Sequence, residues 1–299
     1  MNTSFSIPLP PSFSFEECLW FLNRNYDDCL HAIEQDQLYK VIVIGQQPVL
    51  VRISTQGAQL TIDILKGPVT VAVQDQLKQY ILEWFDLDKE LQAFYTLLHA
   101  HPALSYMPEK FQGLRLIGIP DLFEAVCWAI IGQQINLTFA YTLKRRLVEK
   151  YGLHVDHADK AYHVFPLAAV LADATIPVLK EMQFSTMKAQ YLVDTARAFA
   201  AGAISKAQLS DLPDLASRQK ALTSMRGIGM WTANYALMKS LQEPSYVPYG
   251  DAGLLNALLA HKIIQDKKDA AGILAFFESF AGWESYMVFY LWRSLAVRD

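Results

Sequence analysis

Cysteine is scarce in this 299-residue chain: Cys18, Cys29 and Cys127 are the only three, and their spacing is irregular. This pattern excludes a disulfide framework and the paired cysteines of a structural metal site. The first 12 residues also lack the basic start and apolar core of a secretory signal. The sequence therefore predicts a reduced, cytoplasmic protein that needs no cofactor.

Basic residues are also fewer than acidic ones: the chain has 26 Lys and Arg and 30 Asp and Glu, for a net charge of −4. This balance argues against a general nucleic-acid binder that relies on a basic surface. It is compatible with a specific binder whose phosphate contacts come from main-chain amides. The basic run in the predicted helix over 137–151 (Lys144, Arg145, Arg146 and Lys150) is interpreted as a solvated face.

Long apolar runs are rare as well. Residues 125–143 carry no formal charge over 19 positions, but Gln133, Gln134, Asn136 and Thr138 lie in their middle. Such polar groups are costly in lipid, so a buried helix pair is expected and no membrane span.

A length of 299 residues allows two or three compact units, and a composition of 52% hydrophobic and 12% aromatic residues supports a sizeable core. A helix is predicted over 13–23, with Ser14 and Glu17 as a capping box. Strands are predicted over 39–44, 49–53, 59–65 and 69–73, followed by a helix over 76–85. Arg52, Thr61 and Asp63 alternate with apolar neighbours, which predicts that one face of the sheet is exposed to solvent and the other is buried. Later residues are mostly helical, which predicts an α+β fold with a small antiparallel α/β domain over 1–87 and a helical region over 88–299.

A glycine-rich turn at 226–229 joins two predicted helices, one ending at Met225 and one over 230–241. Gly227 and Gly229 permit positive φ, so that the N–H groups at the start of the second helix can face outward together. The helix dipole makes such a cluster an anion site. A DNA phosphate fits this site without using a single Lys or Arg.

Asp251 follows Trp231 by 20 residues, in a Pro-Tyr-Gly loop that opens a third helix. The segment MRGIGMWTANYAL followed by this aspartate resembles the sequence motif of the helix-hairpin-helix (HhH-GPD) superfamily of base-excision DNA glycosylases. The Trp-Thr-Ala-Asn-Tyr run is most similar to the DNA-3-methyladenine glycosylase II branch, which removes alkylated bases. The GQQIN break at 132–136, residues 184–192 and the helix over 282–293 also resemble this branch.

The resemblance implies an active cleft between two helical subdomains and a role for each matching residue. Asp251 stands at the position of the catalytic aspartate. The base pocket is expected to contain Tyr235, Trp292, Trp231 and Phe21. DNA contacts are expected from Arg226, Gly227, Ile228, Gly229, Thr232, Gln134, Ser185 and Lys188. The resemblance requires no metal, although a monovalent ion on the hairpin carbonyls is compatible with the turn.

The chemistry of base excision suits these residues. Cleavage of the N-glycosidic bond develops positive charge on the sugar, which one carboxylate such as Asp251 can stabilise while it orients water. An alkylated purine is already cationic and departs neutral, so it needs no general acid, and aromatic rings recognise its charge. The nucleotide must first rotate out of the duplex. The expected partner is double-stranded DNA containing alkylated bases, bound by a monomer.

Several alternatives stay open. Asp251 also suits a helix N-cap, Ser185 an ordinary cap, and Gln134 a structural amide rather than a wedge between bases. Gln134 and Glu284 depart from the family pattern. A second hypothesis is therefore a non-catalytic module that binds damaged DNA. A glycosylase for oxidised bases is a third hypothesis. Trp231 occupies the position where bifunctional relatives carry a Schiff-base lysine, so a monofunctional enzyme without lyase activity is predicted.

Overall fold

A five-stranded antiparallel sheet forms the N-terminal part of the computed structural model, which describes residues 3–24 and 26–296. Its strands follow the order β1-β5-β4-β3-β2. They are β1 (Ser4–Pro8), β2 (Ala32–Glu34), β3 (Gln37–Ile44), β4 (Gln47–Gln56) and β5 (Gln59–Lys66). The α+β fold class is confirmed, but the sheet has five described strands where four were predicted.

The predicted strand over 69–73 is wrong. The hydroxyl of Thr70 accepts a hydrogen bond from the N–H of Val73 at 3.2 Å and caps helix α2 (Val71–Phe85). A cap that satisfies an orphan N–H outweighs the strand preference of the valines that follow. The unpredicted strands β1 and β2 are short and lie at the two edges of the sheet.

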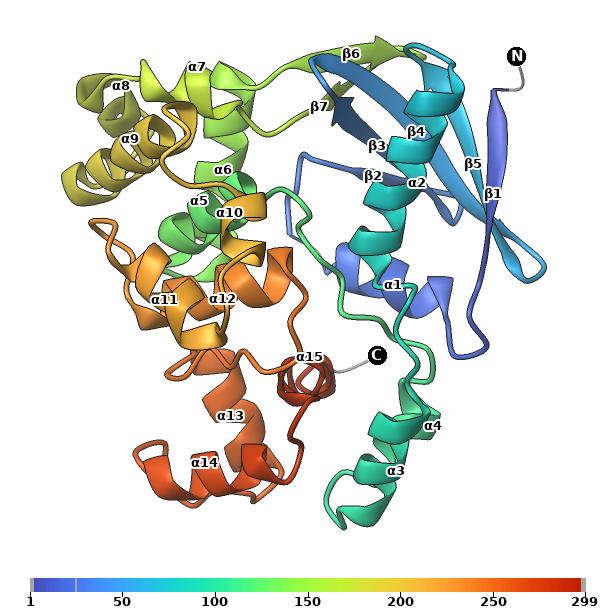
Figure 1. The fold of residues 1–299 in the computed structure, drawn as a ribbon, viewed down its shortest axis with the longest axis vertical. Helices are drawn as coiled ribbons and strands as arrows, with labels where there is room; N and C mark the ends of the chain where they lie inside the picture. Colours follow the sequence, from blue (N-terminus) through green and yellow to red (C-terminus); the bar gives the residue numbers. More distant parts are fainter. Residues whose placement is uncertain (1–2, 25, 297–299) are drawn as a thin grey trace.

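The two faces of the sheet differ as the alternation predicted. Leu60 and Ile62 of β5 are fully buried in the main core. On the opposite face Arg52 donates to the Asp63 carboxylate at 2.9 Å. A second hairpin, formed by β6 (His154–His157) and β7 (Lys160–His163), was not predicted and reaches back over this face, where Tyr162 packs on the sheet (Figure 1).

The remaining described elements are helices. In chain order they are α1 (Phe15–Leu22), α3 (Gln92–Ala100), α4 (Met107–Lys110), α5 (Leu122–Gly132), α6 (Leu137–Tyr151), α7 (Ala168–Ala172), α8 (Ile176–Glu181), α9 (Thr186–Ala200), α10 (Lys206–Ser210), α11 (Leu215–Thr223), α12 (Met230–Ser240), α13 (Ala252–Ala260), α14 (Ala270–Glu278) and α15 (Glu284–Ser294).

Of the helix pair expected in place of a membrane span, α5 is buried, whereas α6 begins exposed at Leu137 and Thr138. The helical conformation is interrupted at residues 133–136. Asn136 then caps α6 by accepting from the N–H of Phe139 at 2.9 Å. Every residue of α5 from Leu122 to Ile131 is buried except Glu124. Within residues 3–24 and 26–296, no helix has the length and apolar character that crossing a bilayer requires.

Helix α15 lies near the centre of the molecule, seen almost end-on in Figure 1, and is buried along most of its length. Arg293 of this helix donates to the carboxylate of Glu17 in α1 at 2.9 Å, and both side chains are almost fully buried. The Arg293 guanidinium also stacks on Trp20, 3.6 Å from the ring centroid. This pair joins α1 to the helix that carries Trp292.

Candidate active site

The hairpin between α11 and α12 has the predicted shape. Gly227 adopts φ +87°, a left-handed conformation that favours glycine. A Cβ at this position would lie 2.2 Å from the ring of Tyr191 in α9. Gly229 is the N-cap residue of α12. Because glycine has no side chain, it cannot accept hydrogen bonds from the first N–H groups of α12 as a Ser or Asp cap would. Tyr191 therefore sets how closely α9 approaches the hairpin, and only glycine fits there.

Gln133 anchors the hairpin to the break between α5 and α6. Its side-chain Nε2 donates to the carbonyl of Gly227 at 3.0 Å and to the hydroxyl of Thr232 at 2.9 Å. Thr232 is 2% exposed and Ile228 is 4% exposed. Their side chains therefore serve packing, and only their main chains remain available for the DNA contacts that the family resemblance implies.

The other predicted DNA-contact residues lie close to the same turn. Ser185 caps α9 by accepting from the N–H of Lys188 at 3.3 Å. The ammonium of Lys188 donates to the carbonyl of Ile131 at 2.7 Å, beside the α5–α6 break. Gln134 is exposed with φ +55°, and Arg226 is exposed. We call Gln134, Ser185, Lys188 and residues 226–229 the turn cluster.

Asp251 is both a helix cap and a fixed carboxylate. It is half-buried at the start of α13, where its Oδ1 accepts from the N–H of Leu254 at 2.8 Å. The same Oδ1 accepts from the indole Nε1 of Trp292 at 2.9 Å. No residue within 3–24 and 26–296 donates to Oδ2. Two donors on one oxygen hold the carboxylate in a single orientation and leave the other oxygen free for a reactant.

The predicted pocket aromatics form one cluster beside Asp251. Tyr235 stacks on Trp231 with ring centroids 5.5 Å apart and lies 6.2 Å from Trp292. Phe21 joins through Phe289, with centroids 4.3 Å apart. The Arg24 guanidinium lies over the Phe21 ring, 3.9 Å from its centroid. The tertiary structure thus brings together residues from α1, α12 and α15, although the faces of Phe21 already have partners.

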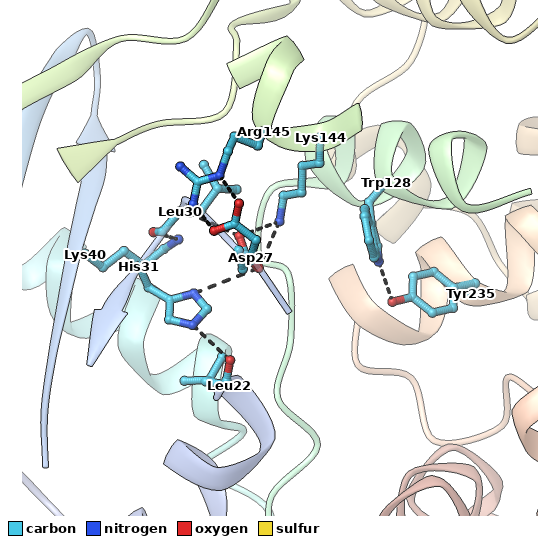
Figure 2. A network of polar contacts seen from close by, with 10 residues as sticks. Leu22, Asp27, Leu30, His31, Lys40, Trp128, Lys144, Arg145 and Tyr235 are labelled. Carbon is cyan, nitrogen blue, oxygen red and sulfur yellow. Dashed lines mark hydrogen bonds and ion pairs between the residues drawn. The ribbon is translucent and has the colours of Figure 1, made fainter. Parts of the chain in front are cut away.

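Trp128 of α5 is a site residue that the sequence pattern did not single out. Its indole Nε1 donates to the Tyr235 hydroxyl at 3.0 Å, as Figure 2 shows. The ring is 8% exposed and packs on Tyr141 of α6, with centroids 4.6 Å apart. In the sequence, Trp128 is marked only by its polar indole N–H in an otherwise apolar helix. A tryptophan in such a helix usually indicates core packing and not a functional site.

A cavity of about 70 Å³ is lined by Tyr235 but not by Asp251, and its lining is rich in charged groups. The interpretation of the α6 basic run as a solvated face is wrong for Lys144, which is 5% exposed and donates to the carboxylate of Asp28 at 3.0 Å. Burial opposes ionisation of Asp28, but Lys144 and His31 outweigh it and hold its pKa well below the usual range. Arg145 of the same run pairs with Asp27 (Figure 2).

Tyr235 and Lys239 line this cavity, and burial shifts the pKa of each. Burial raises the pKa of Tyr235 above its usual range, so its hydroxyl keeps its proton at neutral pH. Burial, together with the charge of Arg24, lowers the pKa of Lys239 well below its usual range. The Lys239 ammonium group donates to the carbonyl of Ile117.

A glycine hairpin next to a capped carboxylate and an aromatic cluster defines the base-excision class of DNA glycosylases. Two family models match this chain. HhH-GPD, described as the HhH-GPD superfamily of base excision DNA repair proteins, matches residues 127–281. The 8-oxoguanine DNA glycosylase N-terminal domain matches residues 22–126. The chain belongs to the HhH-GPD superfamily.

Relatives with assigned names span nearly the whole chain. A DNA-3-methyladenine glycosylase of Bacillus subtilis is 38% identical over 99% of this chain and 98% of its own length. DNA-3-methyladenine glycosylase 2 of Escherichia coli is 25% identical over 96% of each chain. The chain is therefore a DNA glycosylase of base excision repair.

Solved structures confirm the fold. The 3-methyladenine DNA glycosylase of Archaeoglobus fulgidus superimposes with a TM-score of 0.83 at 22% identity, over 96% of this chain and 97% of its own. The 8-oxoguanine glycosylase/lyase of Clostridium acetobutylicum, bound to double-stranded DNA, gives a TM-score of 0.76 at 18% identity, over 98% and 94%. The fold is therefore shared with both 3-methyladenine and 8-oxoguanine glycosylases.

Proposed function

We propose that this protein hydrolyses the N-glycosidic bond of alkylated purines in duplex DNA and leaves an abasic site with both strands intact. The observation that carries the proposal is the Asp251 carboxylate, held by Trp292 and Leu254 at the edge of the aromatic cluster. We further propose that it acts as a monomer in the bacterial cytoplasm, on double-stranded DNA that contains alkylated bases.

Asp251 supplies the electrostatic part of the reaction. As the bond between C1′ and the base breaks, positive charge develops on the sugar, and a pre-oriented carboxylate stabilises it without reorganising. The oxygen left free by Trp292 and Leu254 can also orient the water that attacks C1′. Because both donors bind Oδ1, the carboxylate does not need to rotate during the reaction.

The aromatic cluster supplies recognition of the base. An N3- or N7-alkylated purine is a planar cation, and each ring face that it meets contributes about 0.5–2 kcal/mol. Trp231 and Tyr235 stack on each other, and Trp292 lies between Tyr235 and Asp251. A base held against these rings has its sugar next to the carboxylate.

The turn cluster supplies DNA docking. The main-chain N–H groups at the start of α12 and the N-terminus of α9 are suited to two phosphates, and neither needs a basic side chain. Gln134 is exposed between them, at the position from which a wedge can enter the stack that the rotated nucleotide leaves. The acidic net charge of the chain is compatible with this mode of binding.

Base release from methylated duplex DNA, measured by mass spectrometry, tests the proposal. Wild type should release alkylpurines, and Asp251→Asn should slow release by roughly 10²–10³-fold while keeping DNA binding, because Asn caps a helix as well as Asp. Asp269→Asn is the matched control, since Asp269 is the exposed N-cap of α14, another nine-residue helix. Equal rates for wild type and Asp251→Asn would contradict the proposal.

The monofunctional part of the proposal is tested separately. Trp231 has no amine and cannot form a Schiff base, so borohydride should not trap the protein on damaged DNA and strands should stay intact. The fold also occurs in an 8-oxoguanine glycosylase/lyase. Release of 8-oxoguanine together with trapping would support that alternative, and damage-specific binding without release of any base would support a non-catalytic module.

A further inference from the structure

A tight turn leads the chain into Asp251. The N–H of Asp251 donates to the carbonyl of Pro248 at 3.0 Å. One step earlier, the N–H of Tyr249 donates to the carbonyl of Val247 at 2.9 Å. Gly250 adopts φ +86°, and a positive φ at the third residue of such a turn favours glycine. We call residues 247–251 the Asp251 turn, and the place of the carboxylate depends on where this turn is held.

Asn234 of α12 holds the Asp251 turn. Its side-chain Nδ2 donates to the carbonyl of Val247 at 2.8 Å. Its Oδ1 accepts from Nε2 of Gln219 in α11 at 2.7 Å, which fixes the side of the amide that faces Val247. Asn234 and Val247 are each 2% exposed, so water does not compete for the bond between them. In the part of the chain that the structure describes, no other side chain donates to a carbonyl of residues 247–250.

The earlier part of the loop is held by another helix. The hydroxyl of Ser285 in α15 lies 2.8 Å from the carbonyl oxygen of Glu243 and 2.9 Å from that of Tyr246. Both carbonyls precede the Asp251 turn. The last stretch before the carboxylate therefore depends on Asn234.

Helix α12 thus supports two parts of the site. Its first N–H groups are the phosphate donors proposed above, and Asn234 lies about one helical turn beyond Met230. A helix is rigid over so short a distance. Docked DNA and the Asp251 turn are therefore held by one support, and their separation is fixed.

We propose that Asn234 is a positioning residue for base release: by holding Val247, it sets the distance between the Asp251 carboxylate and the sugar of the docked nucleotide. The inference rests on the glycosylase function proposed above. Displacement of a reacting group by about 1 Å can slow a reaction roughly a hundredfold. Asn234 is buried behind the Asp251 turn, so it acts through Asp251 and takes no part in DNA binding.

Asn234→Ala separates the rate from the affinity. Single-turnover release of 7-methylguanine from duplex DNA should slow roughly tenfold to a hundredfold. Affinity for a duplex that carries a tetrahydrofuran abasic-site analogue should stay within about threefold of wild type, because residues 226–229 are unchanged. A loss of affinity with an unchanged rate would contradict the inference.

Ser240→Ala is the matched control. Ser240 is another buried residue of α12, 2% exposed, and its hydroxyl donates to the carbonyl of Pro120 at 3.3 Å. Both variants remove a buried bond from α12 to a main-chain carbonyl, so both should lower the thermal midpoint. Only Asn234→Ala should slow base release. Equal slowing in the two variants would show a general effect of destabilisation and would overturn the inference.

A double variant tests whether Asn234 acts through the carboxylate. Added to Asp251→Asn, the Asn234→Ala change should slow release by less than about threefold further, because the group that it positions is already gone. Independent losses that multiply would show that Asn234 acts elsewhere.

Hydrogen exchange of residues 247–254, followed by mass spectrometry, tests the anchoring without any activity. Exchange should be faster in Asn234→Ala and unchanged in Ser240→Ala. Faster exchange with a wild-type release rate would sink the positioning role.

Failure of the proposed function gives a different result. A wild type that releases no alkylated base contradicts that function. The exchange comparison then decides the anchoring by itself: it supports the anchor if only Asn234→Ala speeds exchange, and it refutes the anchor otherwise.

Discussion

Trp292 donates its indole N–H to the Oδ1 of Asp251 at 2.9 Å, across 41 residues of sequence. The bond orients the candidate catalytic carboxylate from a different helix, so the site depends on how α13 and α15 pack. Gly253 leaves room for this contact, because a Cβ there would lie 3.2 Å from Oδ1 and 3.3 Å from the Trp292 ring.

Trp292→Phe should therefore slow base release while keeping an aromatic ring in the pocket. Loss of a hydrogen bond to a charged group costs about 1.5–3 kcal/mol, equivalent to roughly ten- to a hundredfold in rate. Single-turnover release of 7-methylguanine measures this loss. Trp283→Phe changes an indole at the N-cap of α15 that does not donate to Asp251, so this variant should leave the rate unchanged. A wild-type rate for Trp292→Phe would show that the bond does not assist catalysis.

Glu17→Gln should destabilise the fold strongly, because it leaves the Arg293 guanidinium buried without its counter-charge. Breaking such a pair costs about 3–5 kcal/mol, whereas replacing both partners by apolar residues is often neutral. Denaturant unfolding should therefore show a large loss for Glu17→Gln and a much smaller one for Glu17→Leu combined with Arg293→Met. Glu16→Gln, at the exposed neighbouring position, should change stability by less than about 0.5 kcal/mol.

Gly227→Ala should distort the hairpin for two separable reasons. Positive φ costs an alanine about 1–2 kcal/mol, and overlap of its Cβ with the Tyr191 ring adds about 1–3 kcal/mol. Adding Tyr191→Ala should relieve only the overlap, which thermal unfolding can resolve. Gly229→Ala is the matched control, since that residue has φ −87° and open space around its Cβ position. Equal stabilities for the two glycine variants would contradict the steric argument.

Gln133→Ala and Gln134→Ala should have opposite profiles although the residues are adjacent. Gln133→Ala removes the donor to Gly227 and Thr232, so stability should fall by about 1–3 kcal/mol and DNA affinity should fall with it. Gln134 is exposed, so Gln134→Ala should leave stability within about 0.5 kcal/mol of wild type. Slower base release from duplex DNA by a stable Gln134→Ala protein would support the wedge role, and an unchanged rate would favour the structural amide.

His31→Asn should flatten the acid limb of the stability profile. Burial lowers the pKa of His31, and Lys40 and Lys144 act in the same direction, while Asp28 opposes them. The unfolded chain therefore binds the proton at a higher pH, near 6.5, than the folded protein does. The contribution of neutral His31 is complete above about pH 6.5 and is lost below it, with a slope of at most about 1.4 kcal/mol per pH unit.

Urea unfolding at pH 7 and pH 5 measures this slope. The wild type should lose more stability between the two values than His31→Asn does. Equal losses would show that another group controls the acid limb.

Local sequence determined the hairpin turn and the helix caps. Gly227 needs positive φ, and Ser14, Asn136, Ser185 and Asp251 each cap the helix that follows them. These features depend on neighbours three or four residues away, so they can be predicted from the sequence. The strand predicted over 69–73 failed because a single hydroxyl, that of Thr70, decided between strand and helix.

Tertiary structure decided how the site residues contact one another and that Trp128 joins them. Trp128, Tyr235, Asp251 and Trp292 belong to four different helices, and the bonds that connect them span 41 and 107 residues. It also decided that Lys144 is buried against Asp28 instead of facing solvent. Hydrophobic periodicity and helix capping depend on residues that are close in the sequence. A hydrogen bond between distant helices depends instead on how the buried faces of those helices pack.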